Sequence, residues 1–493
     1  MMQVKTHIGL IQGDTVGSIA RFRGIPYAQS PLSTGRFNQC LPIDAYDTII
    51  DATQFKHKAP QPRIGQVTPE NDLKQSVDCL YLNIWAPKTF NQKKPVLVWI
   101  HGGAFVIGET AAKMYDGLSF ANNGDLVFVS IQYRLGLFGF IDFSVLNDDK
   151  MSFDSNVGLY DQIAALRWIK QNIAAFGGDQ NNITVMGESA GATSILALMT
   201  SNISESLFNK AIVQSAVIQS VLPKKHAHFW AMKTLEYLNI SIDDKEKLLS
   251  ITDEQAIETA RKIMANYTDI TPGYWAFGPV IDGKIITDSI IDAYKKGKTQ
   301  EIPMLIGYNK DEAALLVKDN DSWLPSNENQ MEKMFTLNET MNRELIVKAY
   351  TDYPSINAYK SINRDYFFTA GALFIADLHA QTNDTYVYRF DYETILAKKM
   401  GIGAFHGAEI MYAFNNLDCE LTKLLAYETD GPKSIADFIH QRWIQFVHDA
   451  NPNPKQDQSW EKYTQDTRKI LLIDTHYAVQ SDPDYQARIV WKL

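Results

Sequence analysis

The sequence has few cysteines, no excess of basic residues and no apolar run long enough to cross a bilayer. Its three cysteines, Cys40, Cys79 and Cys419, are too few and too scattered for a disulfide framework, so we expect a reducing compartment such as the cytoplasm. The longest apolar runs, such as 95–100 and 126–131, are far shorter than the roughly 20 residues of a transmembrane helix. Residues 1–24 also lack the basic and apolar segments of a signal peptide.

The formal net charge of −10 argues against a nucleic-acid or anionic-membrane partner, because both require basic surface. No phosphate-binding glycine loop or clustered Cys/His pattern indicates a cofactor or a metal, so we expect neither. With 493 residues, 45% apolar and 21% charged, the chain matches an ordinary globular protein with a large core. The sequence leaves the oligomeric state open.

Compact apolar runs bounded by turn residues alternate with amphipathic segments, which predicts a mostly parallel sheet with helices on both faces. An N-terminal hairpin is expected from 8–13 and 16–22, with its turn near Gly13 and Asp14. Further strands are predicted at 81–86, 96–100, 126–131, 183–186, 210–214, 303–307, 386–390 and 469–474. Helices are predicted at 159–172, 224–263, 327–381 and 433–449. We find no linker or repeat and predict one domain over 1–493, with helical insertions at about 217–300 and 318–385.

Residues 187–191 (GESAG) match the pattern G-x-S-x-G, which carries a nucleophilic serine when a strand precedes it and a helix follows it. The predicted strand before Gly187 and the helical run after Ser189 meet this condition. Backbone amides at the helix N-terminus would favour the negative charge that develops during attack. Although a plain strand-to-helix turn would share the pattern, the context favours Ser189 as a nucleophile.

A hydrolytic serine needs hydrogen-bond donors for the oxyanion. The segment 101–105 (HGGAF) follows a predicted strand, and its small residues would let backbone amides point into a site. Ala190, directly after the serine, would supply a further amide. We expect His101 itself to be structural.

In this type of site, an acid and then a histidine follow the serine along the chain. Seven histidines follow Ser189: His226, His228, His379, His406, His440, His448 and His476. His406 is favoured because it lies in a glycine-rich loop after a predicted strand, and His476 is its only rival. The acid should follow the strand at 303–307, where spacing alone does not distinguish Asp311 from Glu312.

Together these motifs resemble the type-B carboxylesterase and cholinesterase family, most closely its bacterial para-nitrobenzyl-esterase-type members. The resemblance covers nearly the whole chain and lies in 22–28 (FRGIPYA), 78–85 (DCLYLNIW), 133–136 (YRLG), 156–162 (NVGLYDQ), 176–191 (FGGDQNNITVMGESAG), 278–283 (GPVIDG), 309–312 (NKDE) and 406–410 (HGAEI). It implies an α/β-hydrolase fold and a serine carboxylesterase that needs no cofactor.

The resemblance also implies roles for individual residues. The catalytic triad would be Ser189, Glu312 and His406. The oxyanion donors would be Gly103, Ala104 and Ala190, with Gly102 shaping the loop. Supporting and substrate-pocket roles fall on Ser215, expected to hydrogen-bond the triad acid, and on Trp275 and Phe277, expected to line the acyl pocket or to pack in the core.

Two departures from the family pattern stand out. Ala59 replaces a cysteine that would bridge Cys79, so no disulfide is expected there. Val77 replaces a glutamate, and an ion pair with Arg36 should therefore be lost.

A catalytically silent binding relative is the alternative from another functional class, although such proteins usually lack a triad residue. An amidase, thioesterase or lipase would use the same triad.

Overall fold

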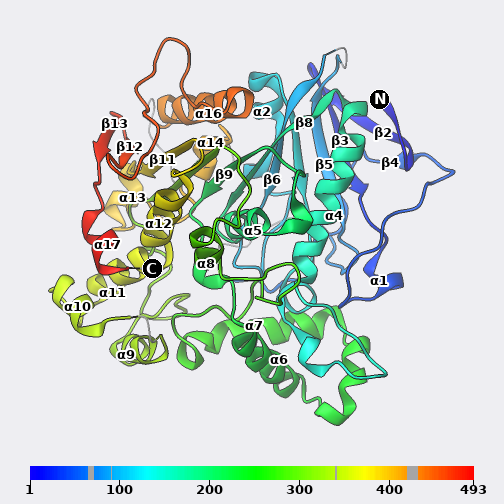
Figure 1. The fold of residues 1–493 in the computed structure, drawn as a ribbon. Coiled ribbons are helices and arrows are strands. Elements are labelled where there is room, and N and C mark those ends of the chain that lie inside the picture. Colours follow the sequence, from blue (N-terminus) through cyan, green and yellow to red (C-terminus); the bar gives the residue numbers. More distant parts are fainter. Residues whose placement is uncertain (65–71, 90–91, 339–340, 419–430, 493) are drawn as a thin grey trace. The chain divides into compact units, whose positions relative to one another are not determined.

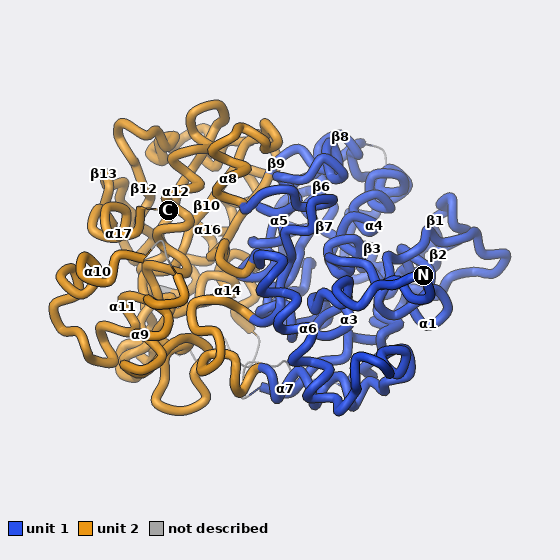
Figure 2. Tube along the Cα trace, turned by 60° about the horizontal axis from the view of Figure 1, so that its bottom comes forward, with its two compact units in different colours: residues 1–210, 221–263, 276–289 blue, residues 211–220, 264–275, 290–493 orange. Residues whose placement is uncertain are grey.

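The computed structural model describes residues 1–64, 72–89, 92–338, 341–418 and 431–492 (Figure 1). Cys419 lies outside these residues. The chain forms two compact units, coloured separately in Figure 2. Unit 1 comprises residues 1–210, 221–263 and 276–289, and unit 2 comprises residues 211–220, 264–275 and 290–493. The predicted single domain over 1–493 stays a prediction.

Unit 1 contains the N-terminal strands and the first α/β repeats. Its strands are β1 (Met2–Thr6), β2 (Gly9–Val16), β3 (Ile19–Pro26), β4 (Ile50–Asp51), β5 (Tyr81–Pro87), β6 (Lys94–Ile100), β7 (Val127–Ile131) and β8 (Gly178–Glu188). Its helices are α1 (Pro31–Thr34), α2 (Leu118–Gly124), α3 (Gly136–Phe140), α4 (Val157–Asn172), α5 (Ala190–Met199), α6 (Lys224–Leu238) and the 3₁₀ segment η6 (Ile242–Ser250). Helix α7 (Asp253–Ile270) begins in unit 1 and ends in unit 2.

The strands of unit 1 follow the order β1-β2-β3-β5-β7-β6-β8, and β4 pairs with β2. Strand β6 runs parallel to both β7 and β8, whereas β5 is antiparallel to β3 and β7. The middle strands form because their valine-, isoleucine- and tryptophan-rich runs are buried, as expected for strands covered on both faces. Helix α2 packs against β5 and β7, and helices α4 and α5 pack against β8.

The described residues of unit 2 form five strands: β9 (Lys210–Gln214, whose first residue belongs to unit 1), β10 (Met304–Asn309), β11 (Thr385–Phe390), β12 (Lys469–Ile473) and β13 (Ala478–Ser481). Its helices are α8 (Ile290–Lys295), α9 (Glu328–Leu337), α10 (Arg343–Ala349), α11 (Ile356–Arg364), the π-helical segment η7 (Asp365–Thr369), α12 (Ala370–His379), α13 (Ile395–Lys399), α14 (Ile410–Ala413), α16 (Gly431–Asp449) and α17 (Tyr485–Val490). Strands β9 to β12 pair in parallel in chain order, and β13 closes the edge in antiparallel fashion. Helix α12 packs against β10 and β11.

Most predicted elements are confirmed, but the turn of the first hairpin is wrong. Strands β2 and β3 pair around Gly17 and Ser18, and Gly17 has a φ of 54°. Gly13 lies instead inside β2, where a Cβ atom would stand 2.2 Å from the carbonyl oxygen of Arg21. That glycine therefore permits a close backbone approach rather than a turn. No helix among the described residues combines the length and the apolar character needed to cross a membrane.

Candidate active site

Ser189 lies between strand β8 and helix α5 in a sharp turn, with φ of 55° and ψ of −120°. Such a conformation is costly for a residue with a side chain and is typical of a nucleophile elbow. The flanking glycines make the turn possible. A Cβ atom on Gly191 would stand 2.0 Å from the carbonyl oxygen of Ile100, and one on Gly187 would stand 2.7 Å from the backbone of Gly191. Ser189 is 8% exposed.

The glycine loop that follows strand β6 lies against this elbow. Strands β6 and β8 are paired in parallel with Ile100 opposite Gly187, so both end at the same edge. A Cβ atom on Gly102 would be 3.0 Å from Cβ of Ser189 and 2.6 Å from Oε2 of Glu188. The predicted contact between the HGGAF loop and the serine is therefore present in unit 1, and only glycine fits at Gly102.

The three expected oxyanion donors are the backbone N–H groups of Gly103, Ala104 and Ala190. Gly103 and Ala104 have φ values of 112° and 53° in a tight turn, in which the N–H groups of Val106 and Ile107 donate to the Gly103 carbonyl. Ala190 is the first residue of α5, where backbone amides have no partner within the helix. Among the described residues, no protein acceptor takes the N–H of these three expected donors, Gly103, Ala104 and Ala190.

The side chain of His101 is packed in the core, in line with the expectation that it is structural. Its ring is fully buried, stacks on Tyr133 with centroids 4.5 Å apart, and has Nδ1 2.8 Å from the Gly102 carbonyl oxygen. Burial lowers the pKa of His101 to about 4, so the ring is neutral at physiological pH. The hydroxyl of Tyr133 donates to the His101 carbonyl and holds the loop from the other side.

Unit 2 contains the acid and the histidine, which form a direct pair. Oε2 of Glu312 is 2.6 Å from Nδ1 of His406, and Glu312 is completely buried. The other carboxylate oxygen, Oε1, accepts the backbone N–H of Asn309 at 2.7 Å. The ring of Phe368, from the π-helical segment, packs on His406 with centroids 4.8 Å apart. Because Nδ1 faces the Glu312 carboxylate, Nε2 is the ring nitrogen on the side away from the acid.

The two alternatives that spacing left open are placed elsewhere. Asp311 does not contact His406 through its carboxylate, which instead accepts the backbone N–H of Ala404 at 3.0 Å. His476 lies exposed between β12 and β13. Two further histidines of unit 2, His379 and His440, are buried with a ring nitrogen near a backbone carbonyl.

Ser215 does not make the bond that the family resemblance implied. Its backbone N–H donates to Gly307 at 2.8 Å, and its φ is 53°. Its hydroxyl is buried and has no hydrogen-bond partner among the described residues. The backbone N–H of Asn309 donates to Glu312 instead, because Asn309 is the last residue of β10 and the chain turns directly after it.

A buried polar group beside the pair was missed from the sequence. Nδ2 of Asn309 donates to the Phe405 carbonyl at 2.8 Å and to Oε2 of Glu409 at 2.6 Å, and Gln214 donates to the other oxygen of Glu409. Burial, followed by the negative charge of Glu312, raises the pKa of Glu409 to about 7. Asn309 lies in the NKDE motif and Glu409 lies in the HGAEI motif. Their places in these two motifs were the signal in the sequence that could have identified this polar group.

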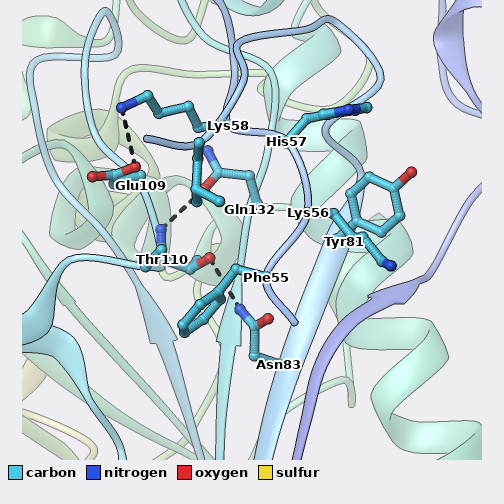
Figure 3. A pocket seen from close by; sticks show the side chains of 11 residues that line it. Phe55, Lys56, His57, Lys58, Tyr81, Asn83, Glu109, Thr110 and Gln132 are labelled. Atoms are coloured by element: carbon cyan, nitrogen blue, oxygen red, sulfur yellow. Dashed lines mark hydrogen bonds and ion pairs between the residues drawn. The ribbon is translucent and has the colours of Figure 1, made fainter. Parts of the chain in front are cut away.

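A small pocket in unit 1 contains none of the predicted site residues. Figure 3 shows Lys58 pointing toward Glu109, with Nζ 3.6 Å from Oε2, and both Gln132 and Asn83 bonded to Thr110. These side chains bond to one another across the pocket, so we regard them as part of the core beneath the 52–64 segment.

Comparison with known proteins gives a consistent result. The model of the carboxylesterase family matches residues 1–490. The chain is 33% identical over 488 residues to the para-nitrobenzyl esterase of Bacillus subtilis (strain 168), covering 98% of this chain and 97% of that protein. It is 30% identical over 509 residues to the cholinesterase of Mus musculus, covering 96% and 83% of the two chains. The solved structure of a thermophilic PNB esterase superposes with a TM-score of 0.90 at 31% identity, covering 99% of each chain.

The chain belongs to the carboxylesterase family. It accordingly has the α/β-hydrolase fold and is a carboxylic ester hydrolase. The resemblance drawn from the sequence motifs is confirmed, including its likeness to para-nitrobenzyl esterases.

This carboxylesterase-family chain departs from the family pattern at Val77 in a way that the structure compensates. The guanidinium of Arg36 lies 3.9 Å from the carboxylate of Asp253, the first residue of α7. Val77 has no carboxylate, so the ion pair expected to be lost is the one from position 77. The ion-pair partner of Arg36 comes instead from a different element, which comparison of a single position in the sequence cannot detect.

The other departure concerns the cysteines. Cys79 is buried and free, and Ala59 is also buried. Burial raises the pKa of the Cys79 thiol well above its usual value, so this thiol is a protonated core group.

The two expected pocket residues are both buried. Trp275, in unit 2, stacks on Tyr267 with centroids 5.6 Å apart and meets Phe367 edge-on at 6.3 Å. Phe277 belongs to unit 1 and is 1% exposed. Because Phe367 and Phe368 are neighbours in η7, one short segment contacts both Trp275 and His406. A π-helical turn is often found at functional positions.

Proposed function

We propose that this carboxylesterase-family chain cleaves its esters through an acyl-enzyme formed on Ser189, with His406 as general base and Glu312 as its orienting acid. The 2.6 Å bond between Glu312 and His406 carries the proposal, because it leaves one imidazole nitrogen in its basic form. The strained turn at Ser189 supports the other half, since such turns expose a nucleophile.

In the first half-reaction, the Ser189 hydroxyl attacks the ester carbonyl carbon while its proton passes to Nε2 of His406. The carbonyl oxygen becomes an oxyanion, held by the N–H groups of Gly103, Ala104 and Ala190. When the intermediate collapses, the bond between the former carbonyl carbon and the alkoxy oxygen breaks, and the departing alkoxide takes the proton from His406. Glu312 stabilises the imidazolium while it exists.

In the second half-reaction, water attacks the acyl-serine and gives a proton to His406. The Ser189 oxygen leaves and recovers that proton, so the products are one carboxylic acid and one alcohol. The same residues would serve an amidase, a thioesterase or a lipase, and the family membership favours the ester. A silent binding relative is disfavoured because all three triad residues are present.

The decisive experiment labels the protein with a fluorophosphonate probe and maps the modified peptide. We expect modification of Ser189, and we expect Ser189→Ala to lower kcat on para-nitrophenyl acetate by at least about 10³-fold. Ser201→Ala is the matched control, because Ser201 is buried just after α5 with a hydroxyl that lacks a partner among the described residues. A Ser189→Ala variant that still turns over, or modification at another residue, would refute the proposal.

We also propose that Trp275 limits the acyl chain, so that short to medium acids, from acetate to hexanoate, are preferred. Its indole is held between Tyr267 and Phe367, which makes it a rigid wall. The Trp275→Ala variant should shift the kcat/KM optimum on para-nitrophenyl esters to longer chains. An unchanged chain-length profile would show that Trp275 only packs in the core.

For the compartment, we propose the cytoplasm. The support is the free thiols of Cys40 and Cys79 together with Ala59 in place of the bridging cysteine. Localisation of a tagged full-length chain by cell fractionation tests this.

A further inference from the structure

The four residues 309–312, which begin at the last residue of β10, each bond to the last residue of β11 or to the chain beyond it. Asn309 donates to the Phe405 carbonyl, and the Lys310 N–H donates to the Phe390 carbonyl. The backbone of Asp311 bonds to Ala404, and Glu312 bonds to His406. Residues 401–409, called here the histidine loop, are therefore attached at positions 404, 405, 406 and 409 to the end of a neighbouring parallel strand and the turn that follows it.

Asp311 makes two bonds with one residue of this loop. Its backbone N–H donates to the Ala404 carbonyl at 3.0 Å, and its Oδ2 accepts the Ala404 N–H at 3.0 Å. The two bonds satisfy both backbone polar groups of a fully buried residue, only two positions before His406. A buried N–H without an acceptor destabilises the folded loop, so removal of the carboxylate should release this part of the loop.

The histidine loop needs such external bonds because its own sequence is permissive. Gly401, Gly403 and Gly407 all have left-handed φ values, of 66°, 53° and 77°. Glycine loses more conformational freedom on ordering than any other residue, so the loop has little intrinsic preference for this shape. A general base must also be held to within a fraction of an ångström of its productive position.

We propose that Asp311 and Asn309 are positioning residues: by holding Ala404 and Phe405, they fix the histidine loop so that His406 meets Glu312. Neither side chain touches the reacting atoms. Asp311 is thus not an alternative triad acid but the residue that aligns the base with the true acid. This inference rests on the proposed function, since it requires His406 to act as the base.

The experiment compares Asp311→Ala, Asp311→Asn and Lys310→Ala in the full chain. We expect Asp311→Ala to lower kcat on para-nitrophenyl acetate by about 10- to 100-fold with KM within about twofold of the wild type. Asp311→Asn should recover most of kcat, because its amide oxygen can still accept the Ala404 N–H. Lys310 has an exposed side chain and bonds through its backbone, so Lys310→Ala should behave as the wild type.

Two readouts separate positioning from a general loss of folding. The endpoint of fluorophosphonate labelling counts competent molecules, so kcat is expressed per labelled site. The downfield proton resonance of the His406 Nδ1–H, assigned by its loss in His406→Ala, should broaden or shift in Asp311→Ala and return in Asp311→Asn. If Asp311→Ala does not fold, Asp311→Glu provides the test, because a longer side chain should misplace the loop while keeping the charge.

The possible outcomes distinguish this inference from the proposed function. If Ser189→Ala abolishes turnover but Asp311→Ala keeps the wild-type kcat per labelled site, the positioning role is wrong and the proposed mechanism stands. If Ser189→Ala remains active, the proposed mechanism itself fails. Equal kcat losses in Asp311→Asn and Asp311→Ala would also overturn the inference, because the hydrogen bond to Ala404 would then not be the cause.

Discussion

Glu409 shares one neighbour, Asn309, with Glu312. The side chain of Asn309 donates to Glu409, while the backbone N–H of the same residue donates to Glu312. Two buried carboxyl groups so close together resist being charged at once. Burial, followed by the negative charge of Glu312, raises the pKa of Glu409 to about 7, so Glu409 keeps its proton at pH values at which an ordinary glutamate has lost it.

We predict that the folded protein becomes less stable as the pH rises and Glu409 loses this proton. The pKa of Glu409 is about 7 in the folded chain, whereas the ordinary pKa of a glutamate is 4.5, so between these limits the folded state binds more protons than the unfolded state. The free energy of unfolding should therefore fall, relative to Glu409→Gln, by up to about 1.4 kcal/mol per pH unit between pH 4.5 and 7 and level off above. Urea unfolding of both variants at several pH values measures this. Parallel curves for the two variants would contradict it.

At the level of single residues, local placement was easier to predict than the supporting contacts. The turn at Ser189 between β8 and α5 was predictable because a strand, a turn and a helix leave a strong local signal. The choice of Glu312 over Asp311 depends on which carboxylate faces the imidazole, a contact across 94 positions that spacing cannot encode. The approach of Asp253 to Arg36 is equally non-local.

At the scale of elements, the histidine loop contains two glycines at which an added methyl group would have different effects. At one position it would cause only backbone strain, and at the other it would also clash with a side chain. Gly401 and Gly403 both have left-handed backbone. A Cβ atom on Gly401 would meet nothing within 4 Å, whereas one on Gly403 would stand 2.2 Å from Oδ2 of Asp311. The two glycines therefore form a matched pair.

We predict that Gly401→Ala loses about 1–2 kcal/mol of unfolding free energy from backbone strain, with little change in kcat. Gly403→Ala carries the same strain and must also displace the Asp311 carboxylate, so it should lower kcat per labelled site by at least about tenfold. Thermal unfolding and steady-state kinetics on the two purified variants test the pair. Equal kcat values in both would show that the Asp311 contact does not govern the loop.

The strands of the parallel core were predictable because buried valine- and isoleucine-rich runs leave a clear pattern. Their directions were not, and β5 proves antiparallel to both of its neighbours. The last strand, β13, was missed because three of its four residues are exposed, which leaves no apolar run to detect. The periodicity of apolar residues in the sequence indicates which segments are buried. It indicates neither the direction of a strand nor the presence of an exposed edge strand.

At the scale of the whole molecule, the chain does not divide at a single point. It passes between the two units five times, after residues 210, 220, 263, 275 and 289. Two of these crossings lie inside regular elements, strand β9 and helix α7, and neither is a flexible linker. Separate unfolding of one unit would require fraying these elements from within, at the cost of their backbone hydrogen bonds.

We therefore predict that the protein unfolds in one cooperative transition. Tryptophan fluorescence and far-ultraviolet circular dichroism should give coincident urea curves, because unit 1 and unit 2 each contain several tryptophans. Val98→Ala in strand β6 and Ile439→Ala in helix α16 remove methyl groups from buried positions of unit 1 and unit 2. Each should shift the same single transition, Ile439→Ala by about 2–5 kcal/mol. A biphasic curve in which Ile439→Ala moves only one step would show that unit 2 unfolds alone, and the chain would then count as two domains.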